Sequence, residues 1–360
     1  MLINDDVKLD YTDVLIRPKR STLTSRFDVD LERKYKFKHS QKTWMGVPIM
    51  ASNMDTVGTF SMADALTQHH MITCIAKHYN ANGSWPTRNH HNENHLCVMG
   101  GISEQDMNNT QKIYKSNEAF FIGLDVANGY TISFVDAVKK MRDLEPDATI
   151  IAGNVVTADM TQELILAGAD IVKVGVGPGS VCTTRIKTGI GMPQLSAVIE
   201  CADAAHGMDA HIIADGGCNN SGDIVKAFAA GADFVMIGGM LAGHDECDGD
   251  VITRICETDE VTSTDDDFYE SVYEEKKFSR FYGMASESAM DRHKVPNREY
   301  RGVEGKTVTV DYKGSVDHTL IDILSGVRSA CTYVGAARLK DLSKCATFIR
   351  VNNTHNTIFN

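Results

Sequence analysis

The sequence is poor in the features that mark several classes of protein. With seven prolines and 42% apolar residues in a chain of 360, it is neither a collagen nor a disordered chain. Its nine cysteines form no C-x-x-C pair, which argues against a small disulfide-bonded scaffold. No uncharged apolar stretch reaches the roughly 18 to 20 residues that cross a bilayer, and residues 1–10 carry acids where a secretory signal carries bases. We therefore expect a soluble, cytoplasmic protein with free thiols and no membrane partner.

The sequence also has no long basic tract of the kind that binds nucleic acid. Its formal net charge is -12, and residues 245–275 alone hold thirteen acids against one base, Arg254. The rest of the chain carries 35 bases and 35 acids, so it is electrically balanced. A nucleic-acid partner is therefore not expected. The acidic run lacks the spacing of an EF-hand and is interpreted as a solvated insert.

A unit of apolar strand, amphipathic helix and glycine recurs along the chain. Residues 149–152 form an apolar run, Thr157 is placed to cap a helix that ends at Gly168, and a second run follows at once. The same order of apolar run, helix, glycine and apolar run is repeated around a helix over residues 221–230. Runs that are apolar throughout are typical of parallel sheets covered on both faces. Eight such strands are predicted, over residues 47–51, 71–75, 97–99, 121–125, 149–152, 171–174, 211–214 and 234–237.

Eight strand–helix units indicate the α/β class and a single (β/α)8 barrel over residues 1–360, with its active site at the C-terminal ends of the strands. A doubly wound open sheet has the same local pattern and stays an alternative. Residues 245–315 follow the eighth strand, so we expect them to form an acidic insert and a flap at the active site. Residues 80–96 indicate a polar surface loop, and the helical spacing of Leu320, Leu324, Val327 and Cys331 indicates a C-terminal helix.

A loop with a cysteine directly follows the sixth predicted strand. Residues 175–185 (GVGPGSVCTTR) combine three glycines with Cys182, Thr184 and Arg185. A lone cysteine is usually a small buried apolar residue. At the end of a barrel strand, however, a thiol is in the position of a catalytic group, and a nearby guanidinium favours its thiolate form.

Two glycine pairs follow the seventh and eighth predicted strands. Asp215 precedes Gly216 and Gly217, and Gly238 and Gly239 follow the last strand. Barrels commonly bind phosphate there through exposed main-chain N–H groups, so the pairs favour a phosphate-bearing ligand over simple turns. No G-x-G-x-x-G opens a helix, so a Rossmann domain is not supported.

Histidines also gather in one polar loop. His90, His91 and His95 lack the flanking cysteines or carboxylates of a zinc site, and we interpret them as solvated.

These motifs together resemble the IMP dehydrogenase and GMP reductase family. The resemblance rests on residues 177–185 (GPGSVCTTR), 9–18 (LDYTDVLIRP), 52–57 (SNMDTV), 215–217 (DGG) and 286–290 (SESAM), and it extends from about residue 6 to 350. It is closest to the reductase branch. It implies a tetrameric barrel that converts GMP to IMP and ammonia with NADPH, as part of purine nucleotide salvage and interconversion.

The resemblance implies the role of each site residue. Cys182 would form a thioimidate with the purine, and Thr184 and Glu304 would protonate the departing amine. Arg185 and the loop residues Gly177, Gly179 and Cys182 would hold a potassium ion. The substrate would contact Asp215, Gly216, Gly217, Gly238, Gly239, Gly283, Met284, Ala285, Arg301, Gly302, Val303 and Gly305.

For the cofactor, the resemblance implies contacts from two subunits of the tetramer. Ser25 and Arg26 would come from a neighbouring subunit. The whole predicted set is Ser25, Arg26, Lys77, Asp125, Val126, Ala127, Val176, Gly177, Tyr300, Ser329, Ala330, Cys331 and Thr332. The sequence departs from the family pattern at Ala285, where a serine is common, and in its longer acidic segment.

Three other functions remain open. An IMP dehydrogenase without its regulatory module is the nearest, although such an enzyme is expected to have glutamine in place of Glu304. A flavin-dependent barrel oxidoreductase would hold its phosphate similarly but gives no reason for the Cys182 loop. A non-catalytic nucleotide sensor is disfavoured because Cys182, Thr184 and Glu304 are all present.

Overall fold

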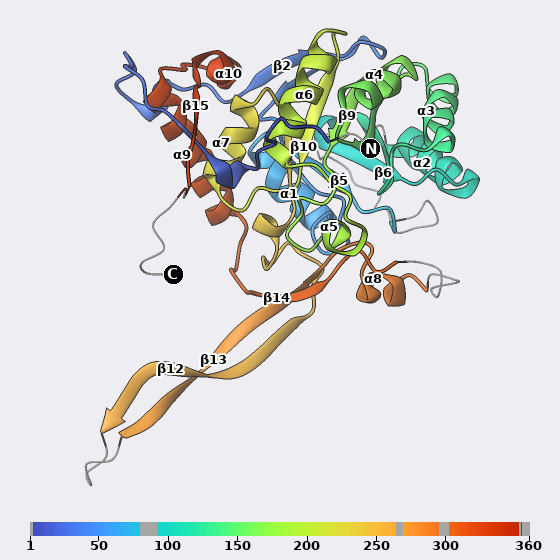
Figure 1. Cartoon of the computed structure of the whole chain (residues 1–360). Coiled ribbons are helices and arrows are strands. Elements are labelled where there is room, and N and C mark those ends of the chain that lie inside the picture. Colours follow the sequence, from blue (N-terminus) through green and yellow to red (C-terminus); the bar gives the residue numbers. More distant parts are fainter. Residues whose placement is uncertain are drawn as a thin grey trace.

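Eight parallel strands close into a barrel with helices around it (Figure 1). The computed structural model describes residues 3–79, 93–117, 119–263, 269–294, 302–352 and 354. The barrel strands are β4 (Ile49–Ala51), β5 (Ile72–Ile75), β6 (Leu96–Gly100), β7 (Phe121–Asp125), β8 (Thr149–Val155), β9 (Ile171–Val174), β10 (His211–Asp215) and β11 (Phe234–Ile237). Every predicted strand is confirmed, and the pairing of β11 with β4 closes the sheet and excludes the open alternative.

The helices cover the outside of the barrel because their apolar faces pack on the strands. Leu164 and Ile165 of one helix, for example, are fully buried. The helices are α1 (Phe60–Gln68), α2 (Glu104–Asn117), α3 (Ile132–Leu144), α4 (Ala158–Leu166), α5 (Thr184–Thr188), α6 (Gln194–His206), α7 (Ser221–Ala229), α8 (Glu287–Arg292), α9 (Asp317–Val334) and α10 (Leu342–Cys345). No helix in the described ranges has the length and apolar character of a membrane span.

Side-chain caps fix where several of these helices begin. Thr59, Thr131, Asn220 and Ser286 each accept a hydrogen bond from a backbone N–H in the first turn. Thr157 occupies the predicted N-cap position of α4, but its hydroxyl accepts from Tyr130 instead of from the helix backbone. The prediction of a helix start at Thr157 is confirmed, and the prediction of a hydroxyl cap is wrong.

Aromatic side chains close the N-terminal end of the barrel. A hairpin of β2 (Arg33–Lys36) and β3 (Thr43–Gly46) precedes the first barrel strand. Its Tyr35 and Trp44 pack, with Phe37, against Phe121 and Phe234 inside the barrel. Among the described residues, these aromatic side chains fill that end of the barrel, which leaves the opposite end, where the strands finish, for a ligand.

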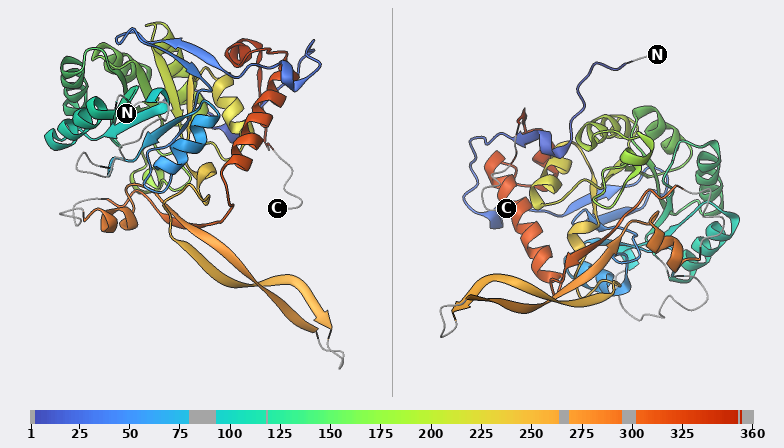
Figure 2. Two further views of the ribbon diagram at one scale, coloured as in Figure 1. Left: turned by 180° about the vertical axis from the view of Figure 1, so that it is seen from behind. Right: turned by 60° about the horizontal axis from the view of Figure 1, so that its bottom comes forward.

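The chain termini and the insert complete the structure. β1 (Val14–Ile16) pairs with β15 (Phe348–Arg350), which joins the two ends of the chain. After β11, the antiparallel strands β12 (Val251–Ser263) and β13 (Tyr269–Tyr282) form a long ribbon that projects away from the barrel (Figures 1 and 2). At its base β13 also pairs with β14 (Thr307–Asp311). The acidic segment is thus an ordered arm over its described residues.

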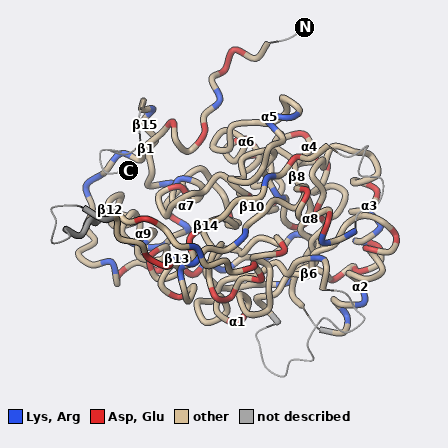
Figure 3. Tube along the Cα trace, turned by 90° about the horizontal axis from the view of Figure 1, so that it is seen from below, with Lys and Arg blue, Asp and Glu red and all other residues tan. Residues whose placement is uncertain are grey.

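Acidic and basic residues are interspersed along the chain trace around the barrel (Figure 3). The described part of the arm carries both signs. Lys276 pairs with Glu274 at 2.8 Å, and Arg254 lies over the ring of Phe278 at 5.5 Å. The ion pair lies within β13, whereas Arg254 on β12 reaches across to Phe278 on β13 and so connects the two strands.

Candidate active site

A cavity of about 320 Å³ lies at the C-terminal end of the barrel. Residues at or just after the C-terminal ends of β4, β7, β8, β9 and β10 line it together with residues of the insert, which is the position predicted for the active site. Its lining includes Ser52, Asn53, Met54, Asp125, Val126, Ala127, Asn154, Lys173, Gly175, Val176, Gly177, Gly179, Cys182, Thr184, Asp215, Gly216, Gly283, Met284, Ala285, Glu304 and Gly305. The structure therefore brings together predicted substrate and predicted cofactor residues that are far apart in the sequence.

The cysteine loop begins where β9 ends, and glycine shapes it. Gly175 and Gly177 have φ angles of 155° and 85°, in the region that other residues rarely adopt. A Cβ at Gly175 would lie 2.2 Å from the carbonyl oxygen of Asp215. The loop is then joined to the end of the insert, because Cys182 forms a backbone bridge with Gly305.

Three side chains of this region form a continuous hydrogen-bonded chain. The Cys182 thiol lies 3.2 Å from Thr184 Oγ1, and that hydroxyl donates to Glu304 Oε2 at 2.6 Å. The Thr183 amide also donates to the Glu304 carbonyl oxygen, at 2.8 Å, so the backbone holds the carboxylate in place. All three predicted catalytic residues thus lie side by side, each partly buried at the cavity wall.

Arg185 does not stand free beside the thiol. Its guanidinium makes an ion pair with Asp10 at 3.0 Å and donates to the Met192 carbonyl oxygen. The Asp10 carboxylate therefore neutralises the guanidinium charge that was expected to favour the Cys182 thiolate. Arg185 instead fixes the N-terminal segment and the residues after α5 around the loop.

A buried lysine between two carboxylates is the main feature that the sequence analysis missed. Lys173 lies on β9 with 4% of its side chain exposed. Its Nζ is 2.9 Å from Asp125 Oδ1 and 3.1 Å from Asp215 Oδ2. Two amides complete the group, since Asn53 donates to Asp125 and Asn154 donates to Asp215, both at 2.8 Å. All five side chains line the cavity.

This group is charged in spite of its burial. Burial alone lowers the pKa of an amine, but the Asp125 and Asp215 carboxylates outweigh it and raise the pKa of Lys173 above its usual range. Burial would likewise raise the pKa of Asp125, but Lys173 and Asn53 hold it below its usual value. One ammonium ion therefore keeps a predicted cofactor residue and a predicted substrate residue at a fixed separation.

The glycine pairs lie where close backbone approach is needed. Gly216 and Gly217 both have φ angles of 85°, and a Cβ at Gly216 would lie 3.1 Å from Pro178 of the cysteine loop. A Cβ at Gly238 would lie 2.8 Å from Ser52 Oγ, which is buried and has no hydrogen-bond partner among the described residues. An unused hydroxyl beside exposed main chain is suited to a phosphate oxygen.

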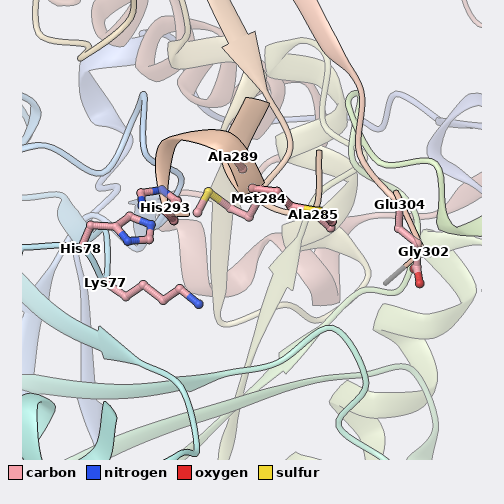
Figure 4. Close-up of a pocket in the computed structure, with 9 residues that line it drawn as sticks. Lys77, His78, Met284, Ala285, Ala289, His293, Gly302 and Glu304 are labelled. Atoms are coloured by element: carbon pink, nitrogen blue, oxygen red, sulfur yellow. The ribbon is translucent and has the colours of Figure 1, made fainter. Parts of the chain in front are cut away.

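The predicted cofactor residues divide between three cavities. Asp125, Val126, Ala127, Val176 and Gly177 line the cavity described above. Lys77 lines a second cavity of about 300 Å³, whose wall it shares with Met284, Ala285 and Glu304 of the first (Figure 4). Ser25, Arg26 and Thr332 line a third, of about 290 Å³.

The other predicted residues lie as follows. Ser329, Ala330 and Cys331 are on α9, and Cys331 is fully buried in the core, so its side chain does not reach a ligand within one chain. Gly302 and Val303 lie just before Glu304, and Thr183 Oγ1 contacts the Val303 carbonyl oxygen at 3.5 Å. Gly239 begins a short 3₁₀ turn beside Ser180. Tyr300 and Arg301 lie outside the described residues.

The predicted potassium ligands also have backbone partners. The Gly179 carbonyl accepts the Cys182 amide at 3.0 Å, and the Arg185 carbonyl accepts the Gly189 amide at 3.1 Å. Each carbonyl keeps a second lone pair, so a cation at this loop remains chemically compatible with them.

The histidines differ from expectation. His90 and His91 lie outside the described residues, whereas His95 is 7% exposed and packs edge-on against Trp44, so its interpretation as solvated is wrong. A cluster that was not predicted unites Asp55, His78 and His293 at the second cavity. Proximity in sequence could not reveal it, because 238 residues separate Asp55 from His293.

Comparison with known proteins extends over the whole chain. Residues 8–357 match the profile of the IMP dehydrogenase / GMP reductase domain. The GMP reductase of Enterobacter sp. (strain 638) is 55% identical over 364 residues, which cover 100% of this chain and 99% of the relative. The GMP reductase 1 of Homo sapiens and that of Mus musculus are each 54% identical over 360 residues, which cover 99% of both chains.

Proposed function

Because the chain belongs to the IMP dehydrogenase / GMP reductase family, we propose that it converts GMP to IMP and ammonia by reductive deamination, with NADPH as reductant. It is an oxidoreductase of purine nucleotide metabolism. The observation that carries the proposal is the chain of hydrogen bonds from Cys182 through Thr184 to Glu304 at the mouth of the barrel. A thiol, a hydroxyl and a carboxylate in this order can both activate a nucleophile and supply a proton.

The purine nucleotide is held by the two halves of the cavity. Asp215 accepts hydrogen bonds from ribose hydroxyls, with its other contacts to Lys173 and Asn154 fixing its direction. The phosphate lies against the main chain of the two glycine pairs, Gly216–Gly217 and Gly238–Gly239, where the Ser52 hydroxyl is available. The base then meets Met284 and Ala285, which line the same cavity from the insert side.

The hydrogen-bonded chain explains how the amine leaves. Transfer of one proton along both bonds leaves a thiolate at Cys182 and a carboxylic acid at Glu304. The thiolate attacks C2 of guanine, and a carbon–sulfur bond forms. Glu304 then returns the proton, through Thr184, to the exocyclic nitrogen, and the carbon–nitrogen bond breaks to release ammonia. The product is a thioimidate in which C2 is electrophilic.

NADPH, when bound, supplies the hydride that reduces C2, and the thiolate is expelled as IMP forms. The residues present suit a dinucleotide. Asp125, Val126 and Ala127 line the first cavity, and the Lys77 ammonium group points into the adjoining cavity, where it can meet a phosphate (Figure 4). Lys173 holds Asp125 in place and so positions the part of the first cavity that would bind the cofactor.

The assembly and localisation are part of the proposal. A homotetramer would let a second copy bring its Ser25 and Arg26 to the barrel mouth, since within one chain these residues line a cavity of their own. Potassium would bind at the carbonyls of residues 177–182. A cytoplasmic location fits the free cysteines.

One assay tests the function against its nearest rival. Purified protein with GMP and NADPH should lose the NADPH absorbance while ammonia and IMP appear in equal amounts. An IMP dehydrogenase would instead form NADH from IMP and NAD, because water hydrolyses the thioimidate. NADH formation without any GMP reduction would refute the proposal.

A further inference from the structure

Asp55, His78 and His293 form a cluster that the proposed reaction does not use. Asp55 follows β4, His78 follows β5, and His293 ends α8 of the insert. The Nε2 atom of His78 is 2.7 Å from Asp55 Oδ1, and that of His293 is 2.5 Å from Asp55 Oδ2. One donor atom of each residue lies within 4.8 Å of the others.

The Asp55 carboxylate is buried without a permanent cation. Its side chain is 1% exposed, and among the described residues no lysine or arginine makes an ion pair with it. The nearby Arg292 instead pairs with Asp248 at 2.6 Å. A buried carboxylate of this kind needs a positive charge or several donors beside it.

A second buried carboxylate in the same molecule shows the contrast. Asp233 also lies between two imidazoles, those of His206 and His211. There the Arg33 guanidinium, 3.3 Å away, supplies a permanent charge, and the Ile212 amide donates at 3.1 Å. At Asp55 no lysine or arginine of the described ranges takes the place of that guanidinium, and Oδ2 has hydrogen-bond contacts with the Tyr282 hydroxyl at 3.2 Å and with His293 Nε2 at 2.5 Å.

The contact between Asp55 and His78 is not an aligned hydrogen bond. Although the two atoms are 2.7 Å apart, both Asp55 Oδ1 and His78 Nε2 are buried with no hydrogen-bond partner among the described residues. A shared proton requires alignment as well as proximity. Two donor atoms that converge without such alignment are arranged like two ligands of one ion.

The two imidazole rings lie face to face. Their centroids are 3.1 Å apart and their planes differ by 10° (Figure 4). The stack brings one nitrogen of each ring to the same carboxylate, so the three donor atoms converge on one point.

We propose that Asp55, His78 and His293 bind one divalent transition-metal ion, for which Zn²⁺ is the best match. Two imidazoles and one carboxylate are a common three-ligand set for zinc, with a fourth position left for water. That position would face the second cavity, which His78 and His293 line and which is large enough for water. Zinc–ligand bonds of about 2.0 to 2.2 Å require the donor atoms to separate by less than about 1 Å from their present distances.

The ligands would connect the insert to the barrel. Asp55 and His78 belong to barrel loops, whereas His293 belongs to α8 of the insert. An ion shared by all three would hold α8, and with it the cavity wall formed by Met284, against the barrel. Since the ion binds only the folded chain, it would also raise stability in proportion to the logarithm of its concentration.

The test uses the full-length protein after removal of metals with a chelator. Titration with Co²⁺ should give visible bands of a four-coordinate ion at one equivalent per chain, without a thiolate charge-transfer band, because no cysteine belongs to the cluster. Calorimetric titration with Zn²⁺ should give the same stoichiometry. Asp55→Asn and His293→Gln should each weaken Zn²⁺ binding by 10-fold or more.

His206→Gln is the matched control, because it removes an imidazole from the Asp233 site, where Arg33 already supplies the charge. It should leave Zn²⁺ affinity unchanged. If Asp55→Asn does not fold, His293→Gln carries the test, since this residue is 19% exposed at the end of a short helix. Absence of stoichiometric binding to the wild-type protein, or binding that both variants retain in full, would overturn the proposal.

Discussion

The Thr184 hydroxyl donates a hydrogen bond to the Glu304 carboxylate at 2.6 Å, although 120 residues separate them in the chain. A hydroxyl alone is too weak an acid to protonate an amine, whereas a carboxylic acid that acts through it is not. Glu304→Gln keeps the hydrogen bond to Thr184 but cannot hold the transferred proton. We expect kcat for GMP reduction to fall about 10²- to 10⁴-fold with little change in GMP affinity, measured by steady-state kinetics and calorimetry. An unchanged kcat would remove Glu304 from the proton path.

Replacing the thiol tests the covalent step. Cys182→Ala should abolish turnover and leave GMP binding intact, because only the nucleophile is lost. Trapping the wild-type enzyme with GMP in denaturant and measuring its mass should show an adduct on the peptide that contains Cys182. Cys345→Ala changes another partly buried thiol, on α10, and should retain full activity. Turnover by the Cys182→Ala variant would refute the thioimidate.

Lys173→Met leaves Asp125 and Asp215 facing each other without their shared cation. Breaking a buried ion pair from one side costs about 3 to 5 kcal/mol, so the free energy of unfolding should fall by that order. KM for both GMP and NADPH should rise, because the two carboxylates repel each other and move apart.

Lys226→Met is the control for that variant. Lys226 is also buried, pairs with Asp223 at 3.3 Å and donates to the Tyr11 carbonyl oxygen at 2.9 Å, but it does not line the cavity. It should lower stability similarly while leaving both KM values unchanged. Equal KM changes in the two variants would mean that Lys173 acts only through stability.

The stability of the barrel should depend on pH through His206. The hydrogen bond to Asp233 raises the pKa of His206 above its ordinary value of 6.5. Because the folded pKa is raised, the stabilisation is complete below about pH 6.5 and disappears as the pH rises through the folded value. His206→Gln should therefore lower the urea midpoint at pH 6 but not at pH 9. As a control, His318→Gln, which changes an exposed histidine, should alter neither midpoint. An equal loss of stability at pH 6 and pH 9 in His206→Gln would contradict the ion pair.

The outer part of the arm should be dispensable for the barrel. Glu257 and Tyr273 face each other in the ribbon. A variant in which an Asn-Gly turn replaces residues 258–272 would therefore close a shorter hairpin. We expect the melting temperature to change by only a few degrees and kcat to stay within about twofold. Light scattering on the same variant reports assembly, and a smaller particle would show that the outer arm contacts another chain.

The strands were predictable because their signal is local. Apolar runs such as residues 171–174 contain enough information to identify a strand buried on both faces, and eight of them in alternation with helices define the barrel. The position of Cys182 at the end of such a strand could be inferred in the same way. Neither inference needs knowledge of which residues meet in space.

Features that depend on distant partners were not predictable. Lys173 stands within an apolar strand, and nothing near it in sequence reveals that Asp215 arrives from the neighbouring β10 and Asp125 from β7, one strand beyond β8. Asp55 and His293 meet only because the insert folds back onto the barrel. The ribbon shape of the arm was not predicted, for another reason. Its acidic residues indicate solvent exposure, and both a ribbon and a loop are exposed to solvent, so composition does not distinguish the two.

The pairing of β4 with β11 joins the first barrel strand to the last, and Ser52 and Gly238 lie directly beyond this junction. On a ribosome, the first of these residues emerges long before the second, and Glu304 follows later still. The proposed nucleotide site is therefore incomplete until most of the chain has been synthesised. Free GMP cannot assist the early steps of folding, and it can stabilise only a molecule whose barrel has already closed.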